Sequence, residues 1–474
     1  MITEIAIQPT GSGSLSLYEE QLTRVFFLMG LGGAFIGFKS GGVSLMTDFT
    51  GIILLIIGIF LCISWQTMIP MLAICSGIIF SPVTAHYGYA MSFLGLGAAL
   101  IISSKIEQEY PPVDSYYSVY RFIFLVFVFT WVILAIQEIS IDFNFFRSLH
   151  IIATNICNFT LFPALLLMVI NRIKIQPETC RYGAILVACT GILMIVTVPH
   201  VGSPLLILDD VSGVSMRYKV FGTTLNVSRA AVGGFLAIVL SPLPFLLLVE
   251  EKRITGIVLA IVTVAGVTKL LFSGARGGMI VFSLTQIIGL LMVNLLKIRI
   301  HTGKLVILAL ICVIGATYFV GQEDMYRWDK FIMDRWSSLG TGQFSWSQDR
   351  PRTWRIGFNY LIEAPLGVGW EKMYYLQKKS ATFHNDFLVI GVAQGVMALV
   401  AYASLVILSI MKGLNLARSG ESNTRRMSGL AGMLAALAFF MSSFFDHQTA
   451  DMIRFQCSWF VVALLTMGSA KNPI

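Results

Sequence analysis

Apolar runs of about 20 residues recur along almost the whole chain, and each is long enough to cross the roughly 30 Å of hydrocarbon in a bilayer as a helix. Of the 474 residues, 56% are hydrophobic and only 12% are charged. A soluble domain carries roughly 25% charged residues, so this chain has too few charges to cover a water-facing surface. The sequence therefore predicts an all-α, polytopic integral membrane protein.

The apolar runs predict about 12–14 transmembrane helices. Two of the runs are short and closely spaced, which leaves the count within that range. No repeat, low-complexity tract or soluble domain interrupts the pattern, so residues 1–474 are predicted to form a single membrane domain. The first 21 residues are polar and lead directly into the first run, so no cleavable signal peptide is expected. The approximate spans are 22–38, 49–65, 68–84, 88–104, 119–137, 149–171, 183–199, 230–249, 254–272, 278–296, 304–320, 385–411, 427–445 and 455–470.

Charge and cysteine content exclude several function classes. The formal net charge of +8 does not indicate nucleic acid as a partner, because no basic run lies on a soluble domain. The seven cysteines show no C-x-x-C spacing, and five of them lie in apolar runs, where a small buried residue is the ordinary interpretation. No Asp-x-Asp pair or other ligand cluster is visible either. We therefore expect no metal and no cofactor.

Lys and Arg in the short loops predict the orientation, because basic residues concentrate on the cytoplasmic side. Four basic loops are each separated from the next by two spans, which places all four on one side. The same parity puts 273–277 and 446–454 outside, and it makes 200–229 and 321–384 periplasmic loops. The four basic loops contain Arg172, Lys174 and Arg181; Lys252 and Arg253; Lys297, Arg299 and Lys304; and Lys412, Arg418, Arg425 and Arg426.

Arg276 is the most unusual charge on the predicted outer side. It lies in a Ser-Gly-Ala-Arg-Gly-Gly turn, 273–278, of only a few residues between two spans. A charge at that depth is costly unless it pairs or faces a polar cavity, and glycines let the backbone approach a ligand or a neighbouring helix closely. Arg276 is therefore a candidate anion-binding residue. The alternative is a structural Arg that pairs with an acidic neighbour or a lipid headgroup.

The loop 321–384 is rich in aromatic and basic residues, and it holds five of the eight tryptophans. Residues 324–339 place apolar side chains on one helical face, a pattern typical of a helix that lies in the membrane interface. Its tryptophans can form an aromatic belt or a stacking platform for sugar rings. A second helix is predicted from Asp349, a good N-cap, to Ala364. Arg350 and Arg352 lie in its first turn, where two guanidinium groups and the helix N-terminus favour a phosphate.

His384 ends this loop, just where the next apolar run begins. A histidine at a membrane boundary is a plausible proton acceptor near neutral pH, although an ordinary interfacial histidine is the simpler interpretation. Three motifs lead up to and include it: Arg350-x-x-x-Trp354, then Ala364-Pro365-Leu366-Gly367-Val368-Gly369-Trp370, then His384-Asn385-x-x-Leu388 followed by Gly395.

Together these motifs resemble the signature of the O-antigen ligase and polymerase superfamily. The turn around Arg276 resembles that family's Ser-Arg turn between two spans. The stretch from Arg217 to Asn226 resembles its Arg…Gly…Asn segment, although the usual Asn-Pro-Asn is Thr224-Leu225-Asn226 here. The resemblance covers about 210–400, and it implies a membrane glycosyltransferase of the bacterial inner membrane with its active site facing the periplasm.

Members of this family transfer a glycan from undecaprenyl diphosphate to an acceptor, which here would be a glycan or lipid A–core. The departing diphosphate calls for Arg donors, and the resemblance assigns Arg217, Arg276 and Arg350 to it, with Arg352 beside them. His384 is the candidate base for the acceptor hydroxyl. With no metal constellation in the sequence, the expected reaction is a direct, inverting and metal-independent displacement.

Two classes of function stay open at this stage. One is a glycan ligase or polymerase of lipopolysaccharide or exopolysaccharide biosynthesis, with protein O-glycosylation as a further branch. The other is a polytopic lipid-glycan flippase or transporter. Transporters often contain internal repeats or paired broken helices at the midplane, whereas the polar motifs here cluster in loops on one side. That clustering favours catalysis at the outer surface.

Overall fold

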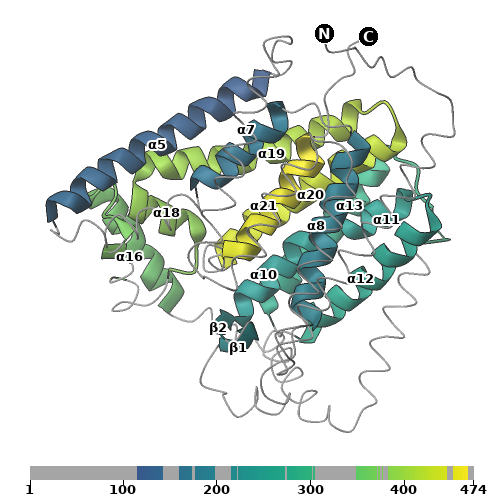
Figure 1. The fold of residues 1–474 in the computed structure, drawn as a ribbon, viewed down its shortest axis with the longest axis horizontal. Helices are drawn as coiled ribbons and strands as arrows, with labels where there is room; N and C mark the ends of the chain where they lie inside the picture. Colours follow the sequence, from purple (N-terminus) through teal and green to yellow (C-terminus); the bar gives the residue numbers. More distant parts are fainter. Residues whose placement is uncertain are drawn as a thin grey trace, which may run out of the picture.

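The computed structural model describes a helical bundle with one small hairpin (Figure 1). The described residues are 115–141, 160–172, 177–197, 215–220, 223–272, 275–301, 303–304, 349–370, 372–373, 376, 383–445 and 452–467. The helices are α5 Ser115–Ile141, α7 Phe162–Arg172, α8 Pro177–Thr197, α10 Arg229–Leu240, α11 Leu243–Val249, α12 Arg253–Phe272, α13 Arg276–Leu295, α16 Asp349–Glu363, α18 Asp386–Gln394, α19 Val396–Ser419, α20 Asn423–Phe445 and α21 Met452–Met467. The hairpin pairs β1 Ser215–Val220 with β2 Thr223–Ser228.

Six helical segments in the described residues are long and apolar enough to cross a membrane. They confirm the prediction of an all-α, polytopic membrane protein, to which the hairpin is a minor addition. The prediction of 12–14 spans extends over segments outside the described residues and stays a prediction. The six are Tyr116–Gln137, Val232–Val249, Arg253–Leu271, Arg276–Leu295, Val396–Ser419 and Asn423–Phe445.

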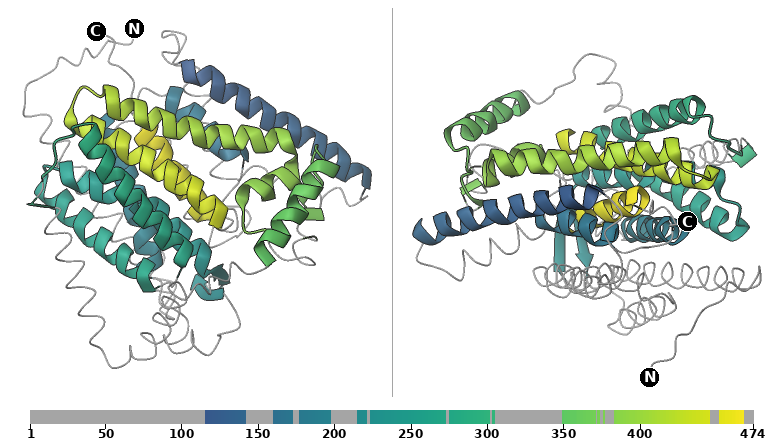
Figure 2. Two further views of the ribbon diagram at one scale, coloured as in Figure 1. Left: turned by 180° about the vertical axis from the view of Figure 1, so that it is seen from behind. Right: turned by 90° about the horizontal axis from the view of Figure 1, so that it is seen from above.

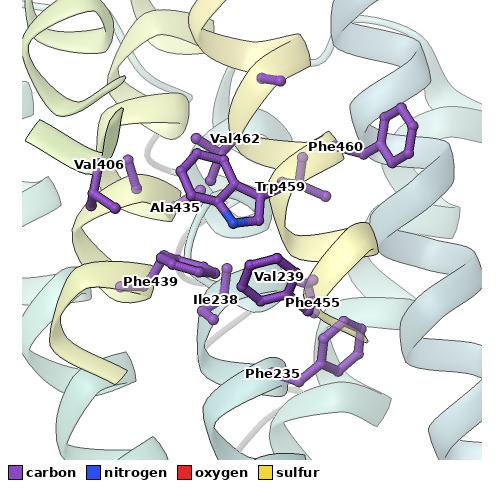
Figure 3. Packing of buried hydrophobic residues seen from close by; sticks show 14 of the residues in the cluster. Phe235, Ile238, Val239, Val406, Ala435, Phe439, Phe455, Trp459, Phe460 and Val462 are labelled. Carbon is purple, nitrogen blue, oxygen red and sulfur yellow. The ribbon is translucent and has the colours of Figure 1, made fainter. Parts of the chain in front are cut away.

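Helix α20 forms the centre of the bundle, where it packs against α19, α10, α13 and α21. Small residues permit the closest approach: a Cβ at Gly413 of α19 would lie 2.6 Å from the backbone nitrogen of Met433. Aromatic rings pack further along α20, where the ring centroid of Phe439 lies 4.9 Å from that of Trp459 (Figure 3). Close packing of this kind, rather than a hydrophobic driving force, holds helices together within lipid.

The predicted span 230–249 contains a break at Ser241–Pro242, which separates α10 from α11. Proline removes a backbone donor, and freed polar groups in hydrocarbon need partners from neighbouring helices. Helix α13 supplies them: the hydroxyls of Ser241 and Thr285 lie 2.8 Å apart, and the amide nitrogen of Gln286 donates to the Ser241 carbonyl at 3.3 Å. The broken helix thus remains a single membrane span.

The predicted span 385–411 is wrong as one helix, because the structure divides it at Gly395. Gly395 has φ of 90°, a left-handed conformation that glycine adopts without steric cost. Helix α18 ends before it and α19 begins after it, so only α19 has the length of a membrane span. A run of apolar residues alone could not reveal the break, since both helices are apolar.

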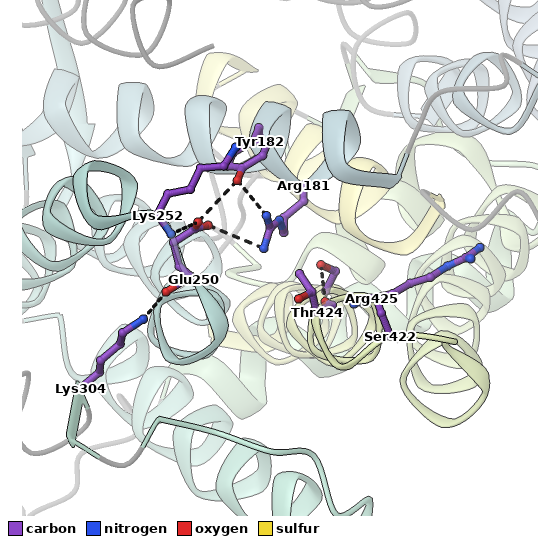
Figure 4. A network of polar contacts seen from close by, with 9 residues as sticks. Arg181, Tyr182, Glu250, Lys252, Lys304, Ser422, Thr424 and Arg425 are labelled. Carbon is purple, nitrogen blue, oxygen red and sulfur yellow. Dashed lines mark hydrogen bonds and ion pairs between the residues drawn. The ribbon is translucent and has the colours of Figure 1, made fainter. Parts of the chain in front are cut away.

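The basic loops gather at one end of the bundle (Figure 4). The carboxylate of Glu250 lies 3.6 Å from the guanidinium of Arg181 and accepts a hydrogen bond from the Tyr182 hydroxyl at 3.5 Å. Its backbone carbonyl accepts a hydrogen bond from the ammonium of Lys304. Arg426, from the fourth loop, donates to the carbonyl of Ala417 and to that of Leu296. The common location of these loops agrees with the shared side that their charges predict.

Candidate functional site

Arg276 lies at the opposite end of α12 and α13 from this basic cluster. Helix α12 ends at Phe272 and α13 begins at Arg276, so the predicted short turn between two spans is confirmed. Arg276 itself is half-buried, and no ion pair joins it to any residue that the structure describes. Gly277 and Gly278 belong to the first turn of α13 rather than to the loop. The positive end of that helix dipole, which favours anions, therefore lies beside the guanidinium.

The hairpin lies at the same end as Arg276. In the backbone register, Arg217 of β1 pairs with Asn226 of β2. Strand β2 leads directly into α10, whose residue Gly233 lies against Ala275 and Gly278. The structure thus brings the hairpin and the start of α13 to one end of the bundle, as the sequence predicts for two outer segments. The hairpin itself was not foreseen from the sequence.

Helix α16 matches its prediction closely, because it runs from Asp349 to Glu363. Arg350 and Arg352 lie in its first turn, and the Arg352 side chain is exposed. Figures 1 and 2 show α16 and α18 side by side at the edge of the bundle. A Cβ at Gly357 of α16 would lie 3.5 Å from the side chain of Leu388, and the Val396 backbone donates to the Pro365 carbonyl at 2.8 Å. The two helices are therefore parallel, with their N-termini at the same end.

His384 directly precedes the N-cap of α18. The Asn385 side chain caps this helix by accepting a hydrogen bond from the Leu388 backbone at 3.1 Å. His384 is half-buried and has φ of 48°, which is uncommon for a residue with a Cβ. Since α16 and α18 are parallel, the predicted base and the predicted Arg350 and Arg352 lie at neighbouring helix N-termini.

The Pro365–Trp370 motif closes the other end of α18. Gly367 and Gly369 have φ of 95° and 83°. The backbone nitrogens of Val368 and Gly369 donate to the carbonyls of Val392 and Ala393 at 2.8 and 3.1 Å. Carbonyls at a helix C-terminus otherwise lack intrahelical partners. The glycines of the motif thus fix the short helix that follows His384.

The C-terminal end of α20 lies between the two groups of predicted site residues. On one side, the ring of Phe444 lies 5.1 Å from that of Phe387 in the first turn of α18. On the other side, a Cβ at Gly277 would lie 3.0 Å from the Cβ of Phe445. The N-termini of α18 and α13, which follow His384 and begin with Arg276, therefore pack against consecutive residues of one helix. An arrangement of helix N-termini with arginines suits a bound anion.

Sequence reasoning gave no role to three residues near His384. Trp354 was part of a motif without a function, yet its indole nitrogen donates to the Phe383 carbonyl at 2.9 Å. Asn385 is the N-cap, a role that its place before an apolar run could have indicated. Asp386 is fully buried in the first turn of α18, and only the fold reveals this, because the next residues are apolar all round.

Among the described residues, no group of three or more His, Cys, Asp or Glu could hold a metal ion. The predicted interface helix at 324–339 lies outside the described residues. Its role as an aromatic belt or as a sugar-stacking platform therefore stays a prediction.

Comparison with known families gives one match. The O-antigen ligase family model matches residues 261–403, a region that begins within α12 and ends in α19 and holds Arg276, Arg350, Arg352 and His384. The predicted resemblance is confirmed for this region, and it supports a membrane enzyme of glycan transfer in general. Arg217 lies outside the matched residues. No curated protein matches the chain.

Proposed function

Because residues 261–403 match the O-antigen ligase family, we propose that this chain is a membrane glycosyltransferase that acts on lipid-linked glycans. The donor is a glycan on undecaprenyl diphosphate, and the acceptor is a hydroxyl group of a second glycan or of lipid A–core. The protein lies in the bacterial inner membrane, with 200–229 and 321–384 on the periplasmic face. No nucleotide-activated sugar is needed, since the lipid diphosphate is itself the leaving group.

One observation carries this proposal: helix N-termini beside Arg276 and His384 pack against Phe444 and Phe445 at one end of α20. A glycosyl transfer from a diphosphate needs cationic donors for the leaving group and a base for the acceptor within one site. The arginine and the histidine come from helices far apart in the sequence. Their approach around α20 therefore favours a shared chemical task over two independent structural roles.

In the proposed reaction, the acceptor hydroxyl oxygen attacks the anomeric carbon of the donor sugar. The bond between that carbon and the diphosphate oxygen breaks, and undecaprenyl diphosphate leaves with the electron pair. His384 takes the proton from the acceptor hydroxyl. A direct displacement of this kind inverts the anomeric configuration and requires no metal.

Arginines hold the diphosphate in this proposal. Arg276 contributes a half-buried guanidinium at the start of α13, where the helix dipole adds to its charge. Arg350 and Arg352 contribute from the first turn of α16, and Arg217 contributes from the hairpin. The planar fork of a guanidinium matches two phosphate oxygens at once, which suits a leaving group whose charge grows during the reaction.

The test is a gene deletion complemented with the wild type or with His384→Ala, followed by analysis of envelope glycans. Loss of transfer in the deletion and in the His384→Ala strain, with restoration by the wild type, supports the proposal. Core without O chains, together with accumulated long lipid-linked chains, indicates a ligase. Single repeat units on the core indicate a polymerase. Unchanged glycans in the deletion strain would overturn the proposal.

A further inference from the structure

A hydrogen bond from Trp354 of α16 reaches the backbone next to His384. Its indole nitrogen donates to the carbonyl of Phe383 at 2.9 Å, and that carbonyl belongs to the peptide bond that joins Phe383 to His384. Trp354 is half-buried, and the Phe383 ring is fully buried against the same helix. The donor and acceptor are thus both held within packed structure rather than on a mobile surface.

The backbone of His384 needs such support. Its φ of 48° places it in the left-handed region, which is unfavourable for residues other than glycine and persists only where the surroundings determine it. On its C-terminal side, Asn385 caps α18 by accepting a hydrogen bond from the Leu388 backbone. On its N-terminal side, the Phe383 carbonyl is fixed by Trp354.

We propose that Trp354 is a positioning residue for His384, which holds the imidazole in the orientation needed to accept a proton. This inference rests on the proposed function, because it takes His384 to be the base. Trp354 does not need to touch substrate in this role. It acts through one hydrogen bond to the peptide group that sets the direction of the His384 side chain.

The test variant is Trp354→Phe, which retains an aromatic ring but removes the indole N–H. A displacement of catalytic groups by about 1 Å can cost up to roughly 100-fold in rate, and we expect turnover of the purified protein to fall by at least about tenfold. Donor-lipid affinity should remain near that of the wild type, because His384 does not hold the diphosphate. The matched control is Trp131→Phe in α5, since Trp131 is also half-buried and its indole nitrogen has no hydrogen-bond partner among the described residues.

A double-mutant cycle separates a positioning role from general loss of stability. If Trp354 acts through His384, then Trp354→Phe should slow the wild type but should not slow the His384→Ala protein further. The residual transfer of His384→Ala can be followed with radiolabelled donor over long incubations. The same fold-loss in both backgrounds would mean that Trp354 only stabilises the fold, and the inference would be wrong.

The two proposals fail in distinguishable ways. If His384→Ala transfers glycan at the wild-type rate, the base assignment in the proposed function is wrong, and the inference falls with it. If His384→Ala is impaired while Trp354→Phe keeps wild-type turnover, only the inference is overturned. A loss in Trp354→Phe matched by an equal loss in Trp131→Phe also overturns it.

Discussion

Gly278 of α13 lies directly against Gly233 of α10: a Cβ at position 278 would be 2.5 Å from the carbonyl carbon of Gly233 and 2.9 Å from its Cα. The two helices therefore touch backbone to backbone only two residues after Arg276. Small residues at such crossings are the usual means by which membrane helices approach closely. The contact fixes the position of Arg276 relative to α10 and to the hairpin that precedes it.

Gly278→Ala should destabilise the protein by about 1–3 kcal/mol, the usual cost of overpacking a well-packed interior. The added methyl group meets backbone atoms of Gly233, which cannot turn aside as the end of a side chain can. The measurement is thermal unfolding of the detergent-purified protein, together with glycan transfer. The matched control is Gly357→Ala in α16, where the new Cβ would meet only side-chain atoms at 3.5 Å. Equal stability of the two variants would contradict the close crossing.

Arg276→Ala should reduce transfer by about 10²–10³-fold, the range seen when one donor to a developing negative charge is removed. It should also weaken binding of the donor lipid, because the same guanidinium holds the diphosphate before reaction. Arg276→Lys retains the charge but loses the planar fork, so it should restore activity only in part. The measurement is turnover and donor affinity on variants of equal thermal stability. Normal donor binding by Arg276→Ala would refute the phosphate assignment.

Much of the architecture could be predicted from the sequence because hydrocarbon thickness dictates helix length. The run 119–137 corresponds to the span in α5, and the helix expected from Asp349 appears as α16. The turn at Arg276 is also where glycine content and span boundaries place it. These features depend on local composition, which can be read from the sequence without knowledge of contacts between distant residues.

Features that depend on contacts between distant segments could not be predicted. The break at Gly395 follows from the packing of that residue against Pro365 and Leu366, 29 or more positions earlier in the chain. The hydrogen bond between Trp354 and Phe383 likewise joins residues separated by 29 positions. The resemblance assigned Arg276 and His384 to one reaction, but the sequence could not show which element lies between them. In the structure, the N-termini of α13 and α18 both pack against the end of α20.

The loop 321–384 should be accessible from the periplasm, because the basic loops lie at the opposite end from Arg276. Ser345→Cys, in a background that lacks other reactive cysteines, should react with an impermeant maleimide in intact spheroplasts. A cysteine placed at exposed Glu421, between α19 and α20, is the matched control and should react only after lysis. The reverse pattern would invert the orientation and would place the proposed site in the cytoplasm.

Chelation should leave glycan transfer intact. The proposed reaction uses arginines to stabilise the departing diphosphate, so its charge does not require a divalent cation. Purified protein should therefore transfer glycan in EDTA without added nucleotide. The readout is product formation from a lipid-linked donor, with and without added magnesium or manganese. If transfer is lost completely in EDTA and a divalent cation restores it, the metal-independent mechanism is wrong.

Asn385→Ala should lower both stability and turnover, whereas Asn385→Ser should retain most of both. The Asn385 side chain accepts a hydrogen bond from the Leu388 backbone at 3.1 Å and so caps α18 next to His384. Loss of an N-cap costs about 0.5–2 kcal/mol, and Ser is about as good a cap as Asn without adding a charge beside buried Asp386. Since α18 spans only nine residues, fraying of its first turn would remove the support that this helix gives to the His384 backbone. Turnover and thermal unfolding should be measured on both variants. If Asn385→Ala loses stability but keeps full turnover, the start of α18 does not determine the position of His384.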